Sequence, residues 1–229
     1  MAGSMTEIPV DGGSVPAYLS LPPAGTGPGV VVIQEWWGLV PHIRNVADRL
    51  AAQGFVAVAP DLYHGKETSE PDEAGKLIMQ KRLDEAAQEM SACVDALLAM
   101  PETTGDGVGV VGFCVGGGLA LYLATLKPEV AAVVSFYGFP REGLEWDLSA
   151  VKGAVLGHYA TDDDFAPRDL ADQIESELRD AGVDVTLHHY PGTQHAFFND
   201  DRPEAYDAEA ADRSWQRTVD FLRERLAGR

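Results

Sequence analysis

Short apolar runs alternate along the chain with stretches in which apolar positions recur every three or four residues. The runs are rich in β-branched side chains, as in residues 30–33, which is typical of strands buried on both faces. The first helical stretch ends near Gly54, a usual helix C-terminus. Strands are expected at 6–21 (a hairpin), 30–33, 55–59, 107–112, 131–136, 154–159 and 183–189, and helices at 43–50, 73–100, 116–126, 170–180 and 208–226.

Strands that alternate with helices predict βαβ units and a mainly parallel sheet with helices on both faces. We expect an α/β fold with a sheet of about eight strands. No stretch has the composition of a linker, so residues 1–229 are expected to form one domain, in which 1–4 are interpreted as an added leader before Met5. Ligands of such sheets bind beyond the carboxyl ends of the strands, so the candidate chemistry is sought there.

One candidate is the segment 110–118 (VVGFCVGGG), which joins an expected strand to an expected helix. It has the G-x-S-x-G pattern of the nucleophile elbow of α/β-hydrolases, with cysteine at the serine position. Gly112 and Gly116 allow a tight turn, and the helix N-terminus favours the thiolate of Cys114. We therefore predict that Cys114 is a nucleophile, the alternative being a structural thiol. Cys93 lies in a helical pattern and is expected in the core.

A nucleophile of this kind needs a base, and the base needs an orienting carboxylate, in the chain order nucleophile, acid, histidine. His195 follows the last expected strand, where this fold carries its base. After the preceding strand the sequence offers Asp162, Asp163 and Asp164. Asp163, four residues before Pro167, has the usual spacing for the acid, and Asp162 is the alternative.

The loop QEWWG (34–38) directly follows the first buried strand. In this architecture that loop and the residue after the nucleophile each supply one N–H group to an oxyanion hole, which indicates Trp36 and Val115. Glu35 places a carboxylate at a buried strand end, where it needs a partner. We interpret Glu35 as controlling the proton of Cys114; alternatively, it accepts hydrogen bonds from nearby backbone N–H groups.

Aromatic side chains gather at the expected strand ends, where some should line an apolar substrate pocket. Phe136 is expected in the core instead. The substrate-binding candidates among them are Trp37, Tyr63, Tyr137 and Phe197.

Charge and cysteine content narrow the partners. The chain has 36 acidic and 17 basic residues, a net charge of −19, which repels phosphate backbones and anionic membranes and favours a monomer. Its two cysteines form no disulfide framework and no CxxC zinc pattern, which favours a reducing, cytoplasmic setting. No run is long enough for a membrane span, and no signal-peptide pattern is visible. A small-molecule substrate and no metal are expected.

These motifs together resemble the dienelactone hydrolase family, a cysteine-dependent branch of the α/β-hydrolase fold, over nearly the whole chain. The resemblance implies a triad of Cys114, His195 and Asp163, with Glu35 keeping the resting thiol poorly reactive and helping to form the thiolate when substrate binds. It also implies a lactone or enol-ester substrate, an acyl-enzyme hydrolysed by water, and no cofactor. The segments that carry it are QEWWG, VAPDLY (58–63), GFCVGG, the Asp-rich turn with FAP, and GTQHAF (192–197).

One departure concerns the two arginines with which the best-known members bind a substrate carboxylate. Where one of them stands, four residues after the catalytic histidine, this chain has Asn199, which cannot form a bidentate ion pair. No arginine aligns with the other, so Arg82 and Arg202 remain as candidates. The sequence thus predicts hydrolysis of lactones or activated esters. The alternatives are an esterase or thioesterase on neutral substrates, a non-catalytic ligand-binding protein, and a redox-sensing thiol.

Overall fold

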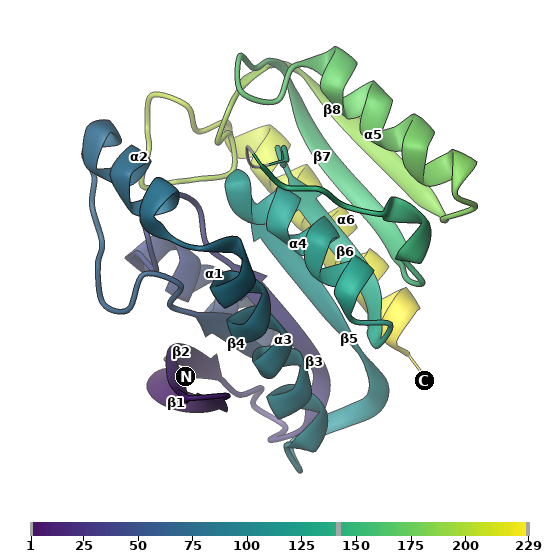
Figure 1. Ribbon diagram of the computed structural model, residues 1–229. Coiled ribbons are helices and arrows are strands. Elements are labelled where there is room, and N and C mark those ends of the chain that lie inside the picture. The colour runs from purple at the N-terminus through teal and green to yellow at the C-terminus, as the bar shows by residue number, and fades with distance from the viewer. Residues whose placement is uncertain (1, 141–142, 228–229) are drawn as a thin grey trace.

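The strands form one sheet in the computed structural model, which describes residues 2–140 and 143–227. In these ranges eight strands run in the order β1-β2-β4-β3-β5-β6-β7-β8 (Figure 1). The hairpin β1–β2 and the β2–β4 pair are antiparallel, and all later pairs are parallel. The strands are β1 (Ser4–Val10), β2 (Gly13–Ser20), β3 (Gly27–Ile33), β4 (Val56–Pro60), β5 (Thr103–Phe113), β6 (Val130–Phe136), β7 (Ala154–Asp162) and β8 (Val185–Gln194).

Helices cover both faces of the sheet, so the chain has the predicted α/β-hydrolase fold (Figure 1). Helices α1 (Pro41–Ala52) and α6 (Ala208–Leu226) pack on one face, whereas α3 (Leu83–Ala99), α4 (Val115–Leu126) and α5 (Arg168–Asp180) pack on the other. Every residue of β4 and β6 is buried, which explains why these strands appear in the sequence as unbroken apolar runs. A short 3₁₀ helix, Leu148–Ala150, precedes β7.

The single helix expected over 73–100 is wrong. The structure has two helices, α2 (Pro71–Gln80) and α3, separated by Lys81 and Arg82 in extended conformation. The break directs the Lys81 ammonium to the Glu89 carboxylate of α3, with 2.6 Å between Nζ and Oε2 and both side chains at most 10% exposed. The spacing of apolar residues carries no information about this ion pair, so the helical pattern in the sequence continues through the break.

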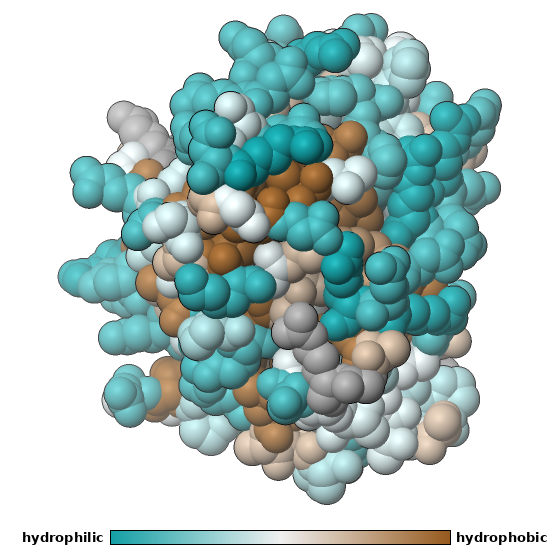
Figure 2. Space-filling model, turned by 90° about the vertical axis from the view of Figure 1, so that its right-hand side faces the viewer, coloured by the Kyte–Doolittle hydropathy of each residue, from teal (hydrophilic) through white to brown (hydrophobic). Residues whose placement is uncertain are grey.

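Part of the N-terminal segment left out of the prediction belongs to the fold. Ser4 begins β1, and the N–H group of Gly3 donates to Asp48 of α1 over 2.9 Å. Within the described ranges, no helix combines the length and the hydrophobicity that crossing a bilayer requires. The face drawn in Figure 2 is mainly hydrophilic, as the net charge suggests, and hydrophobic side chains show mostly in hollows between the polar ones.

Candidate active site

Cys114 occupies a strained turn between the central strand β5 and helix α4. Its backbone is left-handed, with φ 57° and ψ −126°, a conformation that a non-glycine residue keeps only where its surroundings enforce it. The flanking glycines make the turn possible: a Cβ on Gly112 would collide with the carbonyl oxygen of Gly116, and one on Gly116 with that of Gln34. The thiol therefore lies at the carboxyl end of β5 and at the N-terminus of α4.

Asp163 and His195 meet beside this turn, although 32 residues separate them. Asp163 Oδ2 lies 2.8 Å from His195 Nδ1, and Asp163 Oδ1 accepts from the N–H groups of Phe165 and Ala166, each over 2.9 Å. Burial alone would raise the pKa of Asp163, but these hydrogen bonds lower it below its usual value. Asp162, the alternative, is exposed at the end of β7, so the structure brings Asp163 and not Asp162 to His195.

The His195 ring is enclosed by three aromatic rings, with centroid distances of 4.9 Å to Tyr137, 5.0 Å to Phe165 and 6.1 Å to Phe139. Its Nε2 atom is buried and has no hydrogen-bond partner among the described residues. His195 and Cys114 border the same cavity. With Nδ1 engaged by Asp163, the ring is oriented so that Nε2 is left to exchange a proton with a bound molecule.

Opposing influences act on the thiol. Burial raises the pKa of Cys114, and the negative charge of Glu35 raises it further, while the backbone N–H groups of Val115 and Trp36 lower it. The net shift is upward, so the uncharged thiol is the resting form. The same two N–H groups are those predicted for the oxyanion hole, and the structure brings both of them to the sulfur.

Glu35 is 1% exposed and is bonded by side chains rather than by the backbone groups considered as the alternative. Its Oε1 accepts from the Tyr137 hydroxyl over 3.2 Å, and its Oε2 accepts from Asn199 Nδ2 over 2.8 Å. Tyr137 also keeps an unusual backbone, with φ 40°, directly after β6. Tyr137 and Asn199 therefore fix the position of the Glu35 carboxylate near Cys114.

The cavity that holds Cys114 has a volume of about 410 Å³ and a mainly apolar lining. Of the residues considered for substrate binding, Trp37 and Arg202 are among its walls, and Arg202 is the only arginine or lysine there among the described residues. The Arg202 guanidinium lies 5.3 Å from the Trp37 ring centre, and its Nε donates to Glu204 over 2.8 Å. The lining residues are Trp36, Trp37, Pro71, Ile78, Cys114, Val115, Phe139, Phe165, His195 and Arg202.

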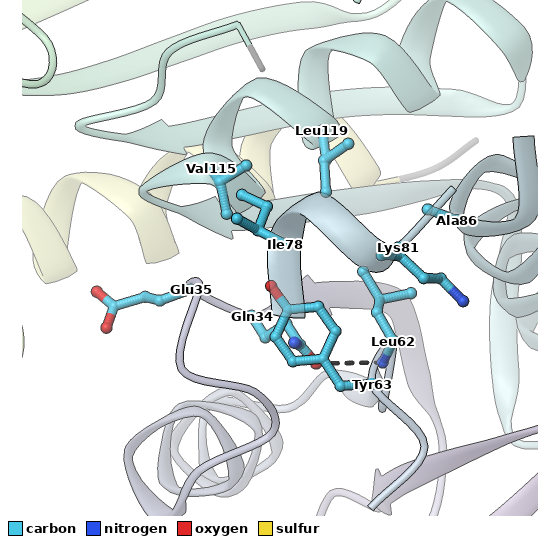
Figure 3. A pocket seen from close by; sticks show the side chains of 9 residues that line it. All are labelled: Gln34, Glu35, Leu62, Tyr63, Ile78, Lys81, Ala86, Val115 and Leu119. Carbon is cyan, nitrogen blue, oxygen red and sulfur yellow. Dashed lines mark hydrogen bonds between the residues drawn. The ribbon is translucent and has the colours of Figure 1, made fainter. Parts of the chain in front are cut away.

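The other substrate-binding candidates lie elsewhere. Tyr137 and Phe197 are completely buried and support the site from within the core. Asn199 is bound to Glu35, and Tyr63 lines a separate, smaller pocket (Figure 3). Arg82 is not among the residues that line the cavity: it lies between α2 and α3, is 67% exposed and is paired with Asp84.

Sequence reasoning missed several wall residues. Pro71 and Ile78 come from α2, whose place over the cavity no local pattern indicates. Phe139, which follows β6, was missed as well. Phe165, which follows β7, was not missed, because it is one of the aromatic residues at strand ends that were expected near an apolar pocket.

Comparison with known proteins gives consistent matches. The dienelactone hydrolase family model matches residues 15–226. Protein usf of Aquifex pyrophilus is 39% identical over 231 residues, covering 98% of this chain and 99% of the relative. A protein of Aquifex aeolicus (strain VF5), whose name provisionally assigns it as a carboxymethylenebutenolidase, is 36% identical over 228 residues, covering 96% and 98%.

A solved structure matches along its full length. It is described as a dienelactone hydrolase-like promiscuous phosphotriesterase from metagenomic libraries. The match has a TM-score of 0.87 and 26% identity, and it covers 99% of this chain and 100% of the other.

Proposed function

The chain belongs to the dienelactone hydrolase family and is a hydrolase of ester bonds, and we propose that it opens lactones or activated esters through a Cys114 thiolate and an acyl-enzyme. One observation carries this proposal: Asp163 holds His195 through Nδ1, Nε2 has no hydrogen-bond partner among the described residues, and His195 and Cys114 line the same cavity. This is the arrangement of nucleophile, base and orienting acid that acyl transfer requires.

The reaction proceeds in two halves. The Cys114 thiolate attacks the ester carbonyl, and the N–H groups of Trp36 and Val115 stabilise the oxyanion that develops. His195, as the imidazolium that Asp163 stabilises, donates its Nε2 proton to the leaving oxygen as the C–O bond breaks, which leaves a thioester on Cys114 and a neutral His195. His195 then takes a proton from water, whose oxygen attacks the thioester and releases the carboxylic acid and the Cys114 thiolate. The thiolate takes back from Glu35 the proton that it lost at the start. Asp163 stabilises the imidazolium in both halves.

Glu35 controls the charge of the nucleophile in this proposal. At rest, burial and the Glu35 carboxylate keep the pKa of the Cys114 thiol above its usual value. A substrate in the cavity brings a polarised carbonyl to the sulfur, and the proton moves from Cys114 to Glu35, which becomes neutral. Asn199 and Tyr137 hold the carboxylate in place for this transfer. Because Cys114 keeps its proton until substrate binds, side reactions of a thiolate in the empty cavity are limited.

Neutral lactones, esters and thioesters are the second candidate substrates, and a specific observation favours them. Two of the candidates for binding a carboxylate lie apart from the cavity, because Asn199 is bound to Glu35 and Arg82 is exposed outside the site. The third candidate, Arg202, lines the cavity and is paired with Glu204. We further propose that the enzyme acts as a monomer, which its net charge of −19 favours, in a reducing compartment, which its two free cysteines favour.

The test is initial-rate hydrolysis of cis- and trans-dienelactone beside 4-nitrophenyl acetate. Cys114→Ala is expected to lose turnover of each ester that the wild type hydrolyses, while Cys93→Ala, which removes a thiol buried within α3, is the matched control and keeps turnover. Intact-mass analysis should find an acyl adduct in the wild type and in Cys93→Ala but not in Cys114→Ala.

Other outcomes have definite meanings. Wild-type turnover in Cys114→Ala would refute the cysteine mechanism. Tight binding without turnover would favour a ligand-binding protein, and reversible oxidation of Cys114 without ester hydrolysis would favour a redox-sensing thiol.

A further inference from the structure

A second, smaller pocket adjoins the catalytic cavity beneath helix α2 (Figure 3). Both spaces have Ile78 and Val115 in their walls. Ile78 comes from α2 and Val115 from the start of α4, and Figure 3 shows the two side chains next to each other. These residues therefore form the partition between the small pocket and the cavity that contains Cys114.

The chemistry of acyl transfer decides which part of a substrate faces this partition. The carbonyl oxygen must lie against the N–H groups of Trp36 and Val115, and the leaving oxygen must lie within reach of His195 Nε2. The acyl substituent is then directed away from His195, on the side where Val115 borders both spaces. Ile78 is the other residue that borders both spaces.

The small pocket has the chemistry of a binding site for an acyl chain. Its surface is mainly apolar, with Leu62, Ala86 and Leu119 in its walls. It also contains one buried donor without a partner among the described residues, the Nε2 group of Gln34. Gln34 is 2% exposed, and its Oε1 is fixed by the N–H group of Leu62 over 3.2 Å (Figure 3). Buried donors are normally hydrogen-bonded, so a ligand with an acceptor atom would gain a hydrogen bond from Gln34 in this pocket.

The small pocket is narrow as long as Ile78 stays in place. Its free volume is about 20 Å³, which is little more than one water molecule occupies by the same measure. However, α2 is lightly held, because Ala74 is its only buried residue. Ile78 is only partly buried and borders both spaces, so a displacement or rotamer change of this side chain is the movement that would connect them.

We propose that the small pocket is the distal end of the acyl-binding site and that Ile78 sets the length of acyl chain the enzyme accepts. The preferred long substrates are esters of unbranched aliphatic acids, and those with an oxygen acceptor near the distal end of the chain gain a hydrogen bond from Gln34. This inference rests on the proposed function, since it takes the positions of the carbonyl and of the leaving group from that mechanism.

The test compares kcat/KM for 4-nitrophenyl acetate, butanoate, hexanoate and octanoate. Ile78→Ala is expected to raise the hexanoate-to-acetate ratio about tenfold or more over the wild type, since each fitted methylene changes kcat/KM by about tenfold or more. Ile78→Phe should lower that ratio. Leu77→Ala is the matched control: Leu77 neighbours Ile78 but borders an outer groove instead of either cavity, so its ratio should stay at the wild-type value.

A second series keeps the acyl group constant and varies the alcohol, with phenyl, 4-nitrophenyl and naphthyl acetates. The ratios of kcat/KM among these three acetates should be the same in Ile78→Ala as in the wild type. The inference is overturned if Ile78→Ala leaves the chain-length profile unchanged or widens the alcohol range instead. Either result would leave the cysteine mechanism standing as long as hydrolysis of the acetate is lost in Cys114→Ala, so the two failures are distinguishable.

Discussion

The turn at Cys114 and helix α2 border the same cavity, yet they differ in how firmly they are held. The turn lies between the central strands, and the first seven residues of α4 after it are all buried. Helix α2 has one buried residue, Ala74, and packs through one side only. The residues proposed for bond making stand on the firmly held side, while Ile78, which faces the substrate, comes from the lightly held side.

The backbone shows the same contrast. Three residues near the site have positive φ values: Cys114 with 57°, Tyr137 with 40° and Ala196 with 67°. Cys114 and Tyr137 directly follow β5 and β6, and Ala196 follows His195 just beyond the end of β8. Such conformations cost about 1–3 kcal/mol each and persist only where dense packing enforces them. The described residues of α2 contain no positive φ value. These three strained positions therefore belong to the rigid side of the cavity, the side of the Cys114 turn, and none belongs to α2.

The largest expected effect breaks the rigid side. Asp163→Asn should lower kcat/KM for the best ester by about 10³–10⁴-fold, because an amide favours the wrong tautomer of His195 and cannot stabilise its imidazolium. The amide oxygen can still accept from the N–H groups of Phe165 and Ala166, so the fold should be retained. Steady-state kinetics and a thermal unfolding curve of the same preparation measure both quantities.

The neighbouring aspartate supplies the control. Asp162 is exposed and its side chain is removed from His195, so Asp162→Asn should change kcat/KM by less than about twofold. If the two variants lost activity equally, the assignment of Asp163 as the orienting acid would be wrong.

Sequence reasoning succeeds where a residue is determined by a strand end. The run 30–33 and the motif around Cys114 indicate strand, turn and helix, and parallel strands bring their carboxyl ends to one edge of the sheet. The pairing of Asp163 with His195 follows from this rule and from the spacing to Pro167. These features are local in sequence, or depend only on the order of strands.

The same reasoning fails where a long-range contact decides. The break at Lys81 depends on a buried ion pair with Glu89, and the bond between Asn199 and Glu35 joins residues 164 positions apart. Neither partner is marked by spacing or composition. The walls that α2 contributes, Pro71 and Ile78, were missed for the same reason, because the position of a lightly held helix depends on the packing around it rather than on its own pattern.

The next effect concerns the anchor of α2. Glu89 accepts from Lys81 Nζ over 2.6 Å and lies 2.7 Å from His64 Nε2, so it joins the end of α2 to the loop that precedes the helix. Glu89→Gln leaves the Lys81 charge without its counter-ion, so the free energy of unfolding should fall by about 1–3 kcal/mol. The loss is limited to this size because the flexible Lys81 stem lets the charge reach water. Hydrogen exchange in α2 should accelerate more than exchange in α4.

Glu85→Gln is the matched control for this anchor. Glu85 lies one turn earlier on α3, and its contact is an exposed pair with Arg82 at 3.6 Å. Such a pair contributes about 0–1 kcal/mol, so exchange in α2 should not change measurably. Equal acceleration in α2 and α4 after Glu89→Gln would contradict the view that the two regions are held separately.

A smaller effect sharpens the description of the rigid side. Glu35→Gln removes the negative charge that, after burial, is the main cause of the raised pKa of Cys114. Loss of this charge lowers the pKa of Cys114 and increases the thiolate fraction at pH 7, so alkylation by iodoacetamide should accelerate by about an order of magnitude. Ester turnover should fall, because the proton acceptor is lost. Faster turnover together with faster alkylation would contradict the proposed role of Glu35.

The smallest effect tests whether α2 unfolds with the rest of the molecule. Gly75 lies inside α2, and a Cβ there would meet no atom within 4 Å. Gly75→Ala should therefore stabilise α2 by about 0.5–1 kcal/mol through helix propensity alone. Gly182→Ala is the control: its Cβ also has free space, but φ is 79°, so alanine should destabilise the protein.

Two measurements on Gly75→Ala distinguish the two possible behaviours of α2. If α2 unfolds at a lower urea concentration than the sheet, hydrogen exchange in residues 71–80 should slow while the urea midpoint of the main transition stays the same, because α2 is already open at that midpoint. If α2 unfolds only with the sheet, the free energy of global unfolding should rise by the same amount, about 0.5–1 kcal/mol. The second result would mean that helix α2 is as firmly held as the turn at Cys114. The size of Ile78, rather than movement of α2, would then set the substrate range.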